Sequence, residues 1–133
     1  MAIVPDMVGI VVSDMGRSLA FYRMLGLDIA EGQDGEEYVQ VITPNGYRIS
    51  WNVASMMQGI HPGWSPTPPA QRDNWVSLAF LCDSPAEVDE TVARIAASGL
   101  GHVIKEPWDA FWGQRYAMIA DPDGNEVDVA AAL

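Results

Sequence analysis

The chain contains an internal duplication, in which each half ends in nearly the same turn. Residues 43–46 read Thr-Pro-Asn-Gly, and residues 121–125 read Asp-Pro-Asp-Gly-Asn. Each half begins with an apolar segment that runs into an aspartate and then into a helical pattern. A repeated unit of this kind can fold its sheets around a shared cleft, so function depends on which side chains the strands point inward.

Length and cysteine content favour one domain that needs no disulfide. A chain of 133 residues can bury a sufficient core by itself. The lone Cys82 lies in an apolar run and is interpreted as a small core residue. Residues 1–12 lack a basic leader, and no apolar stretch approaches the roughly 20 residues of a membrane span. We therefore expect a cytoplasmic protein without a membrane partner.

The net charge of −11, with only seven Lys and Arg residues, argues against nucleic acid as a partner. Binding to nucleic acid requires a surface that neutralises phosphates. Several of the acidic residues fall between residues 28 and 37. This cluster is interpreted as a solvated edge, although its field could also attract a cationic ligand.

The first half is predicted to form a strand, a helix and then further strands. Residues 8–12 are β-rich, and Ser13 and Asp14 offer a helix N-cap. Apolar residues at helical spacing follow as far as Gly26, which ends the helix. Residues 38–42 and 47–51 form a hairpin around the first turn, and the whole half is expected to be strand-helix-strand-strand-strand.

The second half repeats this order. Ser84 to Glu87 form a capping box with Pro85 at the first helical position. The predicted strands cover residues 75–82, 102–106, 115–120 and 125–131. We expect module one at 1–52, a Pro-rich linker at 53–73 and module two at 74–133.

These motifs resemble the vicinal oxygen chelate superfamily, which includes glyoxalase I, extradiol dioxygenases and bleomycin-resistance proteins. The resemblance rests on residues 12–15, 18–22, 25–26, 112–115 and 121–125 and covers essentially the whole chain. It implies an α+β fold of two tandem βαβββ modules, whose curled mixed sheets surround a cleft. It also implies a homodimer.

Metal-dependent members of this family carry ligands on the first and last strands of each module. By the family's spacing, those positions correspond to Met7, Ser50, Val76 and Asp128. Three of these four are not ordinary ligands for a divalent metal, which selects imidazole and carboxylate donors. The two histidines, His61 and His102, lie elsewhere in the sequence. We therefore expect no metal site and no cofactor.

Aromatic residues are the main candidates for the cleft. Trp and Tyr combine large apolar faces with a polar group, which suits planar ligands rich in heteroatoms. The chain has five Trp residues. Polar neighbours of the rings could orient a ligand, although Arg115 could equally form a structural ion pair. The predicted ligand-binding residues are Tyr38, Trp51, Asn52, Trp64, Trp108, Phe111, Trp112, Gln114, Arg115 and Tyr116.

The resulting hypothesis is a non-catalytic protein that sequesters a planar aromatic small molecule, such as an antibiotic, in the manner of bleomycin-resistance proteins. One alternative is a lyase, isomerase or dioxygenase of the same fold. It could be metal-dependent through other ligands, or metal-free with Asp128 or Glu126 as a general base. Another alternative is an interaction module whose exposed Trp and Met residues bury against a second protein.

Overall fold

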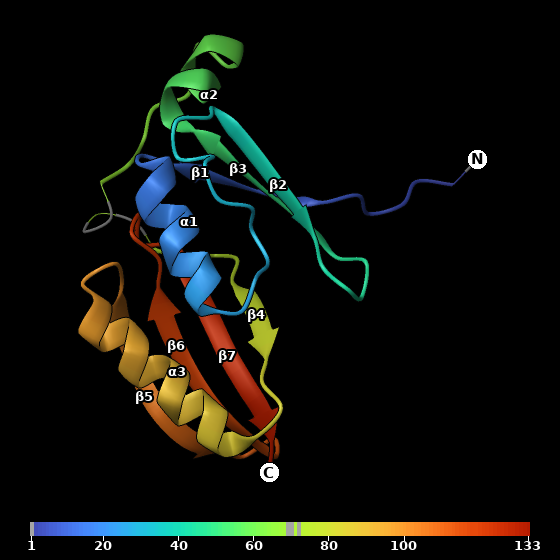
Figure 1. Cartoon of the computed structure of the whole chain (residues 1–133), viewed down its shortest axis with the longest axis vertical. Coiled ribbons are helices and arrows are strands. Elements are labelled where there is room, and N and C mark those ends of the chain that lie inside the picture. The colour runs from blue at the N-terminus through green and yellow to red at the C-terminus, as the bar shows by residue number, and fades with distance from the viewer. Residues whose placement is uncertain (1, 69–70, 72) are drawn as a thin grey trace.

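The computed structural model describes residues 2–68, 71 and 73–133. Met1 and residues 69, 70 and 72 of the expected linker therefore lie outside the described residues. Figure 1 shows the arrangement of the elements. In chain order they are β1 (Val8–Val12), α1 (Met15–Met24), β2 (Tyr38–Ile42), β3 (Arg48–Val53), α2 (Ala54–Ile60), β4 (Leu78–Leu81), α3 (Pro85–Ser98), β5 (His102–Ala110), β6 (Gln114–Ala120) and β7 (Glu126–Ala132).

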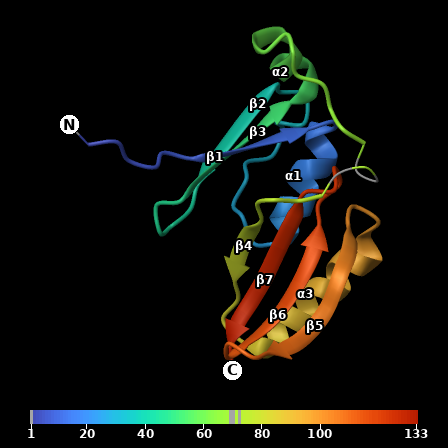
Figure 2. The same ribbon diagram turned by 180° about the vertical axis from the view of Figure 1, so that it is seen from behind.

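The strands form two mixed sheets, one from each half of the chain. The first sheet has the order β1-β3-β2, and the second has the order β4-β7-β6-β5. In both, the first strand of the half runs parallel to the last one. Helices α1 and α3 cover the same side of the molecule, as Figure 2 shows from behind. Each sheet therefore has a helix-covered face and an open face, and both open faces lie on the side away from the helices.

The first module has one strand fewer than the expected βαβββ order. No strand forms between α1 and β2, where residues 27–37 take an irregular path. This stretch contains Gly32 and Gly35 together with several acidic residues, which are depleted in strands. Gly32 adopts a positive φ of 82°, which interrupts an extended backbone. The segment expected to be an irregular Pro-rich linker also differs from the prediction, because helix α2 forms near its start.

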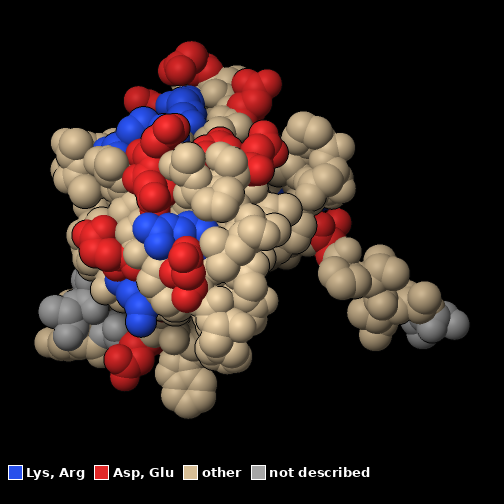
Figure 3. Space-filling model, turned by 90° about the horizontal axis from the view of Figure 1, so that it is seen from below, with Lys and Arg blue, Asp and Glu red and all other residues tan. Residues whose placement is uncertain are grey.

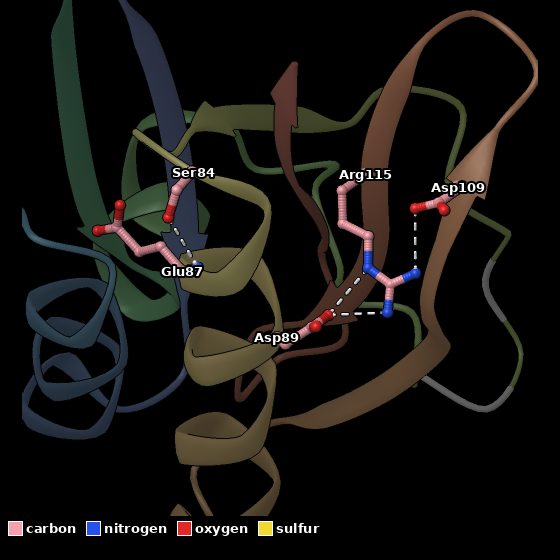
Figure 4. Close-up of polar contacts among 5 residues, drawn as sticks. All are labelled: Ser84, Glu87, Asp89, Asp109 and Arg115. Atoms are coloured by element: carbon pink, nitrogen blue, oxygen red, sulfur yellow. Dashed lines mark hydrogen bonds and ion pairs between the residues drawn. The ribbon is translucent and has the colours of Figure 1, made fainter. Parts of the chain in front are cut away.

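The predicted helix caps are confirmed. Asp14 accepts a hydrogen bond from the backbone N–H of Arg17 at 3.1 Å. Ser84 accepts one from the backbone N–H of Glu87 at 3.2 Å, and the two residues are drawn in Figure 4. The Glu87 carboxylate reaches back to the N–H of Asp83 at 2.9 Å. These bonds satisfy amide groups that a helix leaves without a partner in its first turn.

One hydrophobic core joins the two modules. Trp51 and Tyr22 from the first half and Ile95 and Ile119 from the second are all fully buried. Cys82 packs against this core, and its burial raises the pKa of its thiol. Cys82 is only partly buried at the edge of the core, so its interpretation as a core residue holds in part, and its burial disfavours the reactive thiolate.

The surface is acidic, and none of the helices in the described ranges has the length and apolar character that a membrane span requires. In the view of Figure 3, Lys and Arg side chains lie among Asp and Glu side chains on the same face. Four Arg-to-carboxylate ion pairs occur in the described part of the chain. The face in Figure 3 thus shows no continuous basic patch of the kind that phosphate groups would attract.

Candidate functional site on the open face

The register of β6 assigns its side chains to two faces. Ala117 and Ile119 are fully buried on the face that α3 covers. Because side chains alternate along a strand, Gln114, Tyr116 and Met118 point to the open face.

Aromatic side chains gather on this open face of the second sheet. The rings of Trp108 and Tyr116 lie 5.5 Å apart, and those of Trp112 and Tyr116 lie 5.1 Å apart. Trp108 and Trp112 complete the triangle at 5.9 Å, and all three pairs meet edge to face. Phe111 extends this group from the β5–β6 turn and is 97% exposed. We call Trp108, Phe111, Trp112 and Tyr116 the aromatic cluster.

A neighbouring polar side chain holds Trp112 in place. The Trp112 indole donates a hydrogen bond to the side-chain oxygen of Gln114 at 2.8 Å. Because the rings pack edge to face, they leave no parallel slot between them. A flat ligand would therefore lie on the cluster rather than slide between two of its rings.

A buried carboxylate adjoins the cluster. Tyr116 donates a 2.7 Å hydrogen bond from its hydroxyl to Oδ2 of Asp128 in β7. Asp128 is only 3% exposed although it lies on the open face, and its Oδ1 has no hydrogen-bond partner among the described residues. Glu126 lies on the same face two residues earlier. The open face thus combines rings with a pair of acidic groups.

The acidic pair perturbs its neighbours. Burial, then the hydrogen bond to Asp128 and the charges of Asp128 and Glu126, raise the pKa of Tyr116 to about 12. Burial and the adjacent Asp128 also raise the pKa of Glu126. A carboxyl whose pKa is raised by burial and by a like charge holds its proton to higher pH. This arrangement can bind a cation or move a proton.

The first sheet contributes polar residues to its own open face. Ser50 and Asn52 alternate with the buried core residues of β3 and approach each other at 3.4 Å. Tyr38 pairs with Asn52 in the ladder and donates to Gln40 at 3.0 Å. No contact joins Tyr38 or Asn52 to the aromatic cluster, so these two predicted residues form a separate group.

The prediction that Trp51 points into the cleft is wrong. Trp51 is fully buried on the helix-covered face of β3, and its ring centre lies 5.3 Å from that of Tyr22. The prediction assigned both Trp51 and its neighbour Asn52 to the cleft, but adjacent residues of a strand point to opposite faces, and it is Asn52 that shares a face with Tyr38. Trp51 is therefore a core residue that a ligand cannot reach.

Arg115 also lies away from the aromatic cluster. It points to the helix-covered face, where its guanidinium meets Asp89 of α3 at 3.0 Å and Asp109 of β5 at 3.2 Å (Figure 4). These two ion pairs hold the side chain against α3 and raise its pKa. The structural interpretation of Arg115 thus applies, and its role as a ligand-binding residue does not.

Trp64 is separate from the aromatic cluster and lines two other cavities. One, of about 510 Å³, lies between the linker, the end of β1 and the Pro122–Asp123 turn. The other, of about 420 Å³, lies between β1 and β4 and reaches Glu126. Trp108, Trp112 and Tyr116 line neither of these two cavities. Of the predicted residues, the structure therefore brings together Trp108, Phe111, Trp112, Gln114 and Tyr116.

The residues at the family's metal positions do not fit a metal. Val76 is an exposed apolar residue, and Met7 offers only a thioether that contacts the Tyr38 hydroxyl at 3.8 Å. Ser50 and Asp128 remain, and one carboxylate with one hydroxyl is a poor donor set for a divalent ion. In the described ranges, no three His, Cys, Asp or Glu side chains group as metal ligands would.

Lys105 is a residue of the open face that the sequence did not reveal. Its ammonium lies 4.3 Å from the ring centre of Trp108. Strict alternation would put residues 105 and 108 on opposite faces, but irregularities in β5 place Lys105 opposite Met118 and Trp108 opposite Tyr116. A bulge inserts an extra residue and so re-aims a side chain. Pro107, between them, was the only local signal of such an irregularity.

Solved structures similar to this chain share its fold. SA1046, a hypothetical protein from S. aureus, is 22% identical, with a TM-score of 0.79 and coverage of 99% of this chain and 96% of that one. A glyoxalase/bleomycin resistance protein/dioxygenase family enzyme from Burkholderia phytofirmans is also 22% identical, at a TM-score of 0.79, covering 96% and 98%. A protein of unknown function from Agrobacterium tumefaciens is 29% identical, at a TM-score of 0.72, covering 100% and 97%.

Sequence comparison gives the family directly. No curated protein matches the chain significantly. The profile of the Glyoxalase/Bleomycin resistance protein/Dioxygenase superfamily, by contrast, matches residues 4–129. The chain therefore belongs to the glyoxalase/bleomycin resistance protein/dioxygenase superfamily, as its repeated motifs indicated.

Proposed function

We propose that this protein binds and sequesters a planar aromatic small molecule without transforming it. The observation that carries the proposal is the aromatic cluster on the open face, where three rings meet edge to face beside Asp128. Trp112 remains 47% exposed, so its ring offers apolar surface that a ligand can cover. An antibiotic is the ligand class that we favour, in keeping with the bleomycin-resistance branch of the family.

Contacts with the aromatic rings alone would bind a ligand only weakly. Aromatic packing contributes about 0.5–1.5 kcal/mol per ring pair beyond the buried area, which corresponds to roughly a 2- to 10-fold gain in affinity. Useful sequestration therefore also needs enclosure. We propose that a second copy of the chain provides it, because large apolar side chains remain uncovered. Apart from Phe111 of the aromatic cluster, the most exposed are Ile3, Val4, Trp75, Val76 and Leu81.

Tryptophan fluorescence tests the binding function. Titration with bleomycin, a mitomycin, a quinone and a quinoxaline antibiotic should give saturable quenching by at least one compound. Replacement of Trp108 or Trp112 by Phe should reduce that quenching and the affinity, whereas Trp64→Phe tests the cavities at the linker instead. Absence of saturable quenching by all four compounds would contradict the proposal.

Dimerisation has its own test. Gel filtration with light scattering over a dilution series should give twice the chain mass of 14.5 kDa. Leu81→Glu, in the exposed edge strand β4, should shift the protein toward the monomer because it buries a charge in the proposed interface. A monomer at all concentrations would contradict this part of the proposal. The alternative, in which this apolar surface binds a different protein, would also leave the isolated chain monomeric.

A second candidate function is proton transfer without a metal. The Tyr116 hydroxyl donates a hydrogen bond to Asp128, and Glu126, whose pKa is raised, lies next to them. This arrangement suits general acid–base chemistry. Activity on small oxo or thiol-conjugated substrates that falls at least about 100-fold in Asp128→Asn would support this candidate over sequestration. An equal, low turnover by both proteins would exclude it.

A further inference from the structure

The aromatic cluster already holds a cation, and that cation comes from the protein. The Lys105 ammonium lies 4.3 Å from the ring centre of Trp108, which is a cation–π contact. In the described part of the chain, no carboxylate lies within ion-pairing distance of Lys105. The ring face is thus the partner that positions this charge, and it is electrostatically suited to a positive group.

The same face presents an acceptor without a donor. Oδ2 of Asp128 is satisfied by Tyr116, whereas Oδ1 is buried and meets no donor among the described residues while the neighbouring Glu126 is ionised. A buried carboxylate oxygen without a donor is costly to the folded protein. A ligand that brings an N–H group and a positive charge to this oxygen removes that cost.

These two features are contiguous. The ring of Tyr116 lies 5.5 Å from that of Trp108, under Lys105, and its hydroxyl bonds to Asp128. One ligand can therefore cover the rings with its flat part and direct a nitrogen toward the carboxylate. Because Asp128 is almost fully buried, the group that reaches it must be small, such as an amino or amidinium group.

We infer that the ligand of this site is an aromatic cation with at least one N–H donor, which engages Oδ1 of Asp128 and takes the place of the Lys105 ammonium at the Trp108 ring. This inference rests on the proposed function and specifies the chemical class of its ligand. It assigns Lys105 as an intramolecular competitor and Asp128 as the residue that selects charge. A neutral ring system of the same size would gain only the ring contacts.

Three probes with the same ring system separate ring contact, charge and hydrogen bonding. Acridine is neutral at about pH 7.5, N-methylacridinium is a cation without an N–H donor, and 9-aminoacridine is a cation with N–H donors. Isothermal titration calorimetry measures each affinity at about 50 mM and 300 mM salt, because salt suppresses nonspecific attraction to an acidic protein. We expect 9-aminoacridine to bind about 10-fold or more tightly than acridine at both salt concentrations.

Two variants test whether Asp128 and Lys105 cause the preference for cationic probes. Asp128→Asn should remove most of the advantage of 9-aminoacridine while acridine affinity stays within about 2-fold. Lys105→Gln should raise the affinity of both cations about 2- to 5-fold and leave acridine unchanged. Glu90→Gln on α3 makes the same charge change as Asp128→Asn, and Arg17→Gln on α1 makes the same charge change as Lys105→Gln. Both helices cover the faces of the sheets that point away from the open face. These two controls measure the effect of net charge alone.

Each outcome decides the inference. Tight binding of 9-aminoacridine that Asp128→Asn abolishes and Lys105→Gln improves supports it. Equal affinities for acridine and 9-aminoacridine overturn it while leaving sequestration of aromatic ligands intact. A preference that Glu90→Gln reduces as much as Asp128→Asn also overturns it, since the general field would then be the cause. No binding of any probe overturns both the inference and the proposed function. Thermal unfolding of each variant verifies that it is folded.

Discussion

The hydroxyl of Tyr22 in α1 donates a 2.8 Å hydrogen bond to the buried carboxylate of Asp121, in the turn between β6 and β7. The bond joins the two modules across 99 positions in sequence. Asp121 also accepts bonds from its own turn, at Asp123 and Asn125. The duplicated turn therefore serves the second module and at the same time anchors the first module's helix.

Replacement of Tyr22 by Phe should lower the free energy of unfolding by about 1.5–3 kcal/mol, because it removes a buried hydrogen bond to a charged group and leaves that acceptor short of a donor. Urea unfolding measures this loss. Tyr47→Phe, at an exposed position, is the control and should change stability by less than about 0.5 kcal/mol. An equal loss in both variants would show that the Tyr22–Asp121 hydrogen bond does not add to the free energy of unfolding.

The change Trp51→Phe distinguishes a core residue from a ligand-binding residue. We expect a loss of about 1–2 kcal/mol in the free energy of unfolding, since part of a fully buried side chain disappears. The cost is moderated because the Trp51 indole N–H has no hydrogen-bond partner among the described residues, so its removal relieves an unsatisfied group. Affinity for an aromatic ligand should not change. A loss of affinity at unchanged stability would return Trp51 to the site.

The sequence predicted the parts of the fold that local chemistry determines. The capping residues Asp14 and Ser84 and the repeated Pro-containing turns all lie where their side chains and backbones require, with Gly46 and Gly124 at φ 83° and 82°. The family followed from the same motifs. Local patterns of this kind act within a few residues, so they can be recognised without knowledge of tertiary contacts.

Residue orientation in the strands was harder to predict, for a physical reason. Trp51, which was predicted at the cleft together with its neighbour Asn52, faces the core, and the irregularities in β5 brought Lys105 onto the same face as Trp108. Strand pairing and bulges depend on partners far away in the sequence. Most of the aromatic cluster was nevertheless predicted, because Trp108, Trp112 and Tyr116 come from one hairpin.

Glu126 should make stability depend on pH in a direction that its raised pKa determines. A carboxyl with a raised folded-state pKa adds stability below its ordinary pKa of 4.5, and this stability is lost as pH rises through the raised value. Glu126→Gln removes this loss. Relative to the unsubstituted protein, the variant should therefore gain stability between about pH 4.5 and pH 7.5, as urea unfolding at both pH values would show. A difference between the two proteins that is the same at both pH values would contradict the prediction.

Gly101, just before β5, lies close against the backbone of Ala120. A Cβ there would collide with the backbone oxygen of Ala120 and would lie 2.7 Å from the Phe21 ring. Both groups belong to buried residues and cannot easily give way, so Gly101→Ala should lower the free energy of unfolding by about 3 kcal/mol or more. Gly35→Ala is the matched control, because a Cβ at Gly35 meets nothing within 4 Å. Urea unfolding of the two variants should give a large loss for the first and a change within about 0.5 kcal/mol for the second. Similar stabilities would mean that β5 can move away from α1 without cost, which the shared core of the two modules argues against.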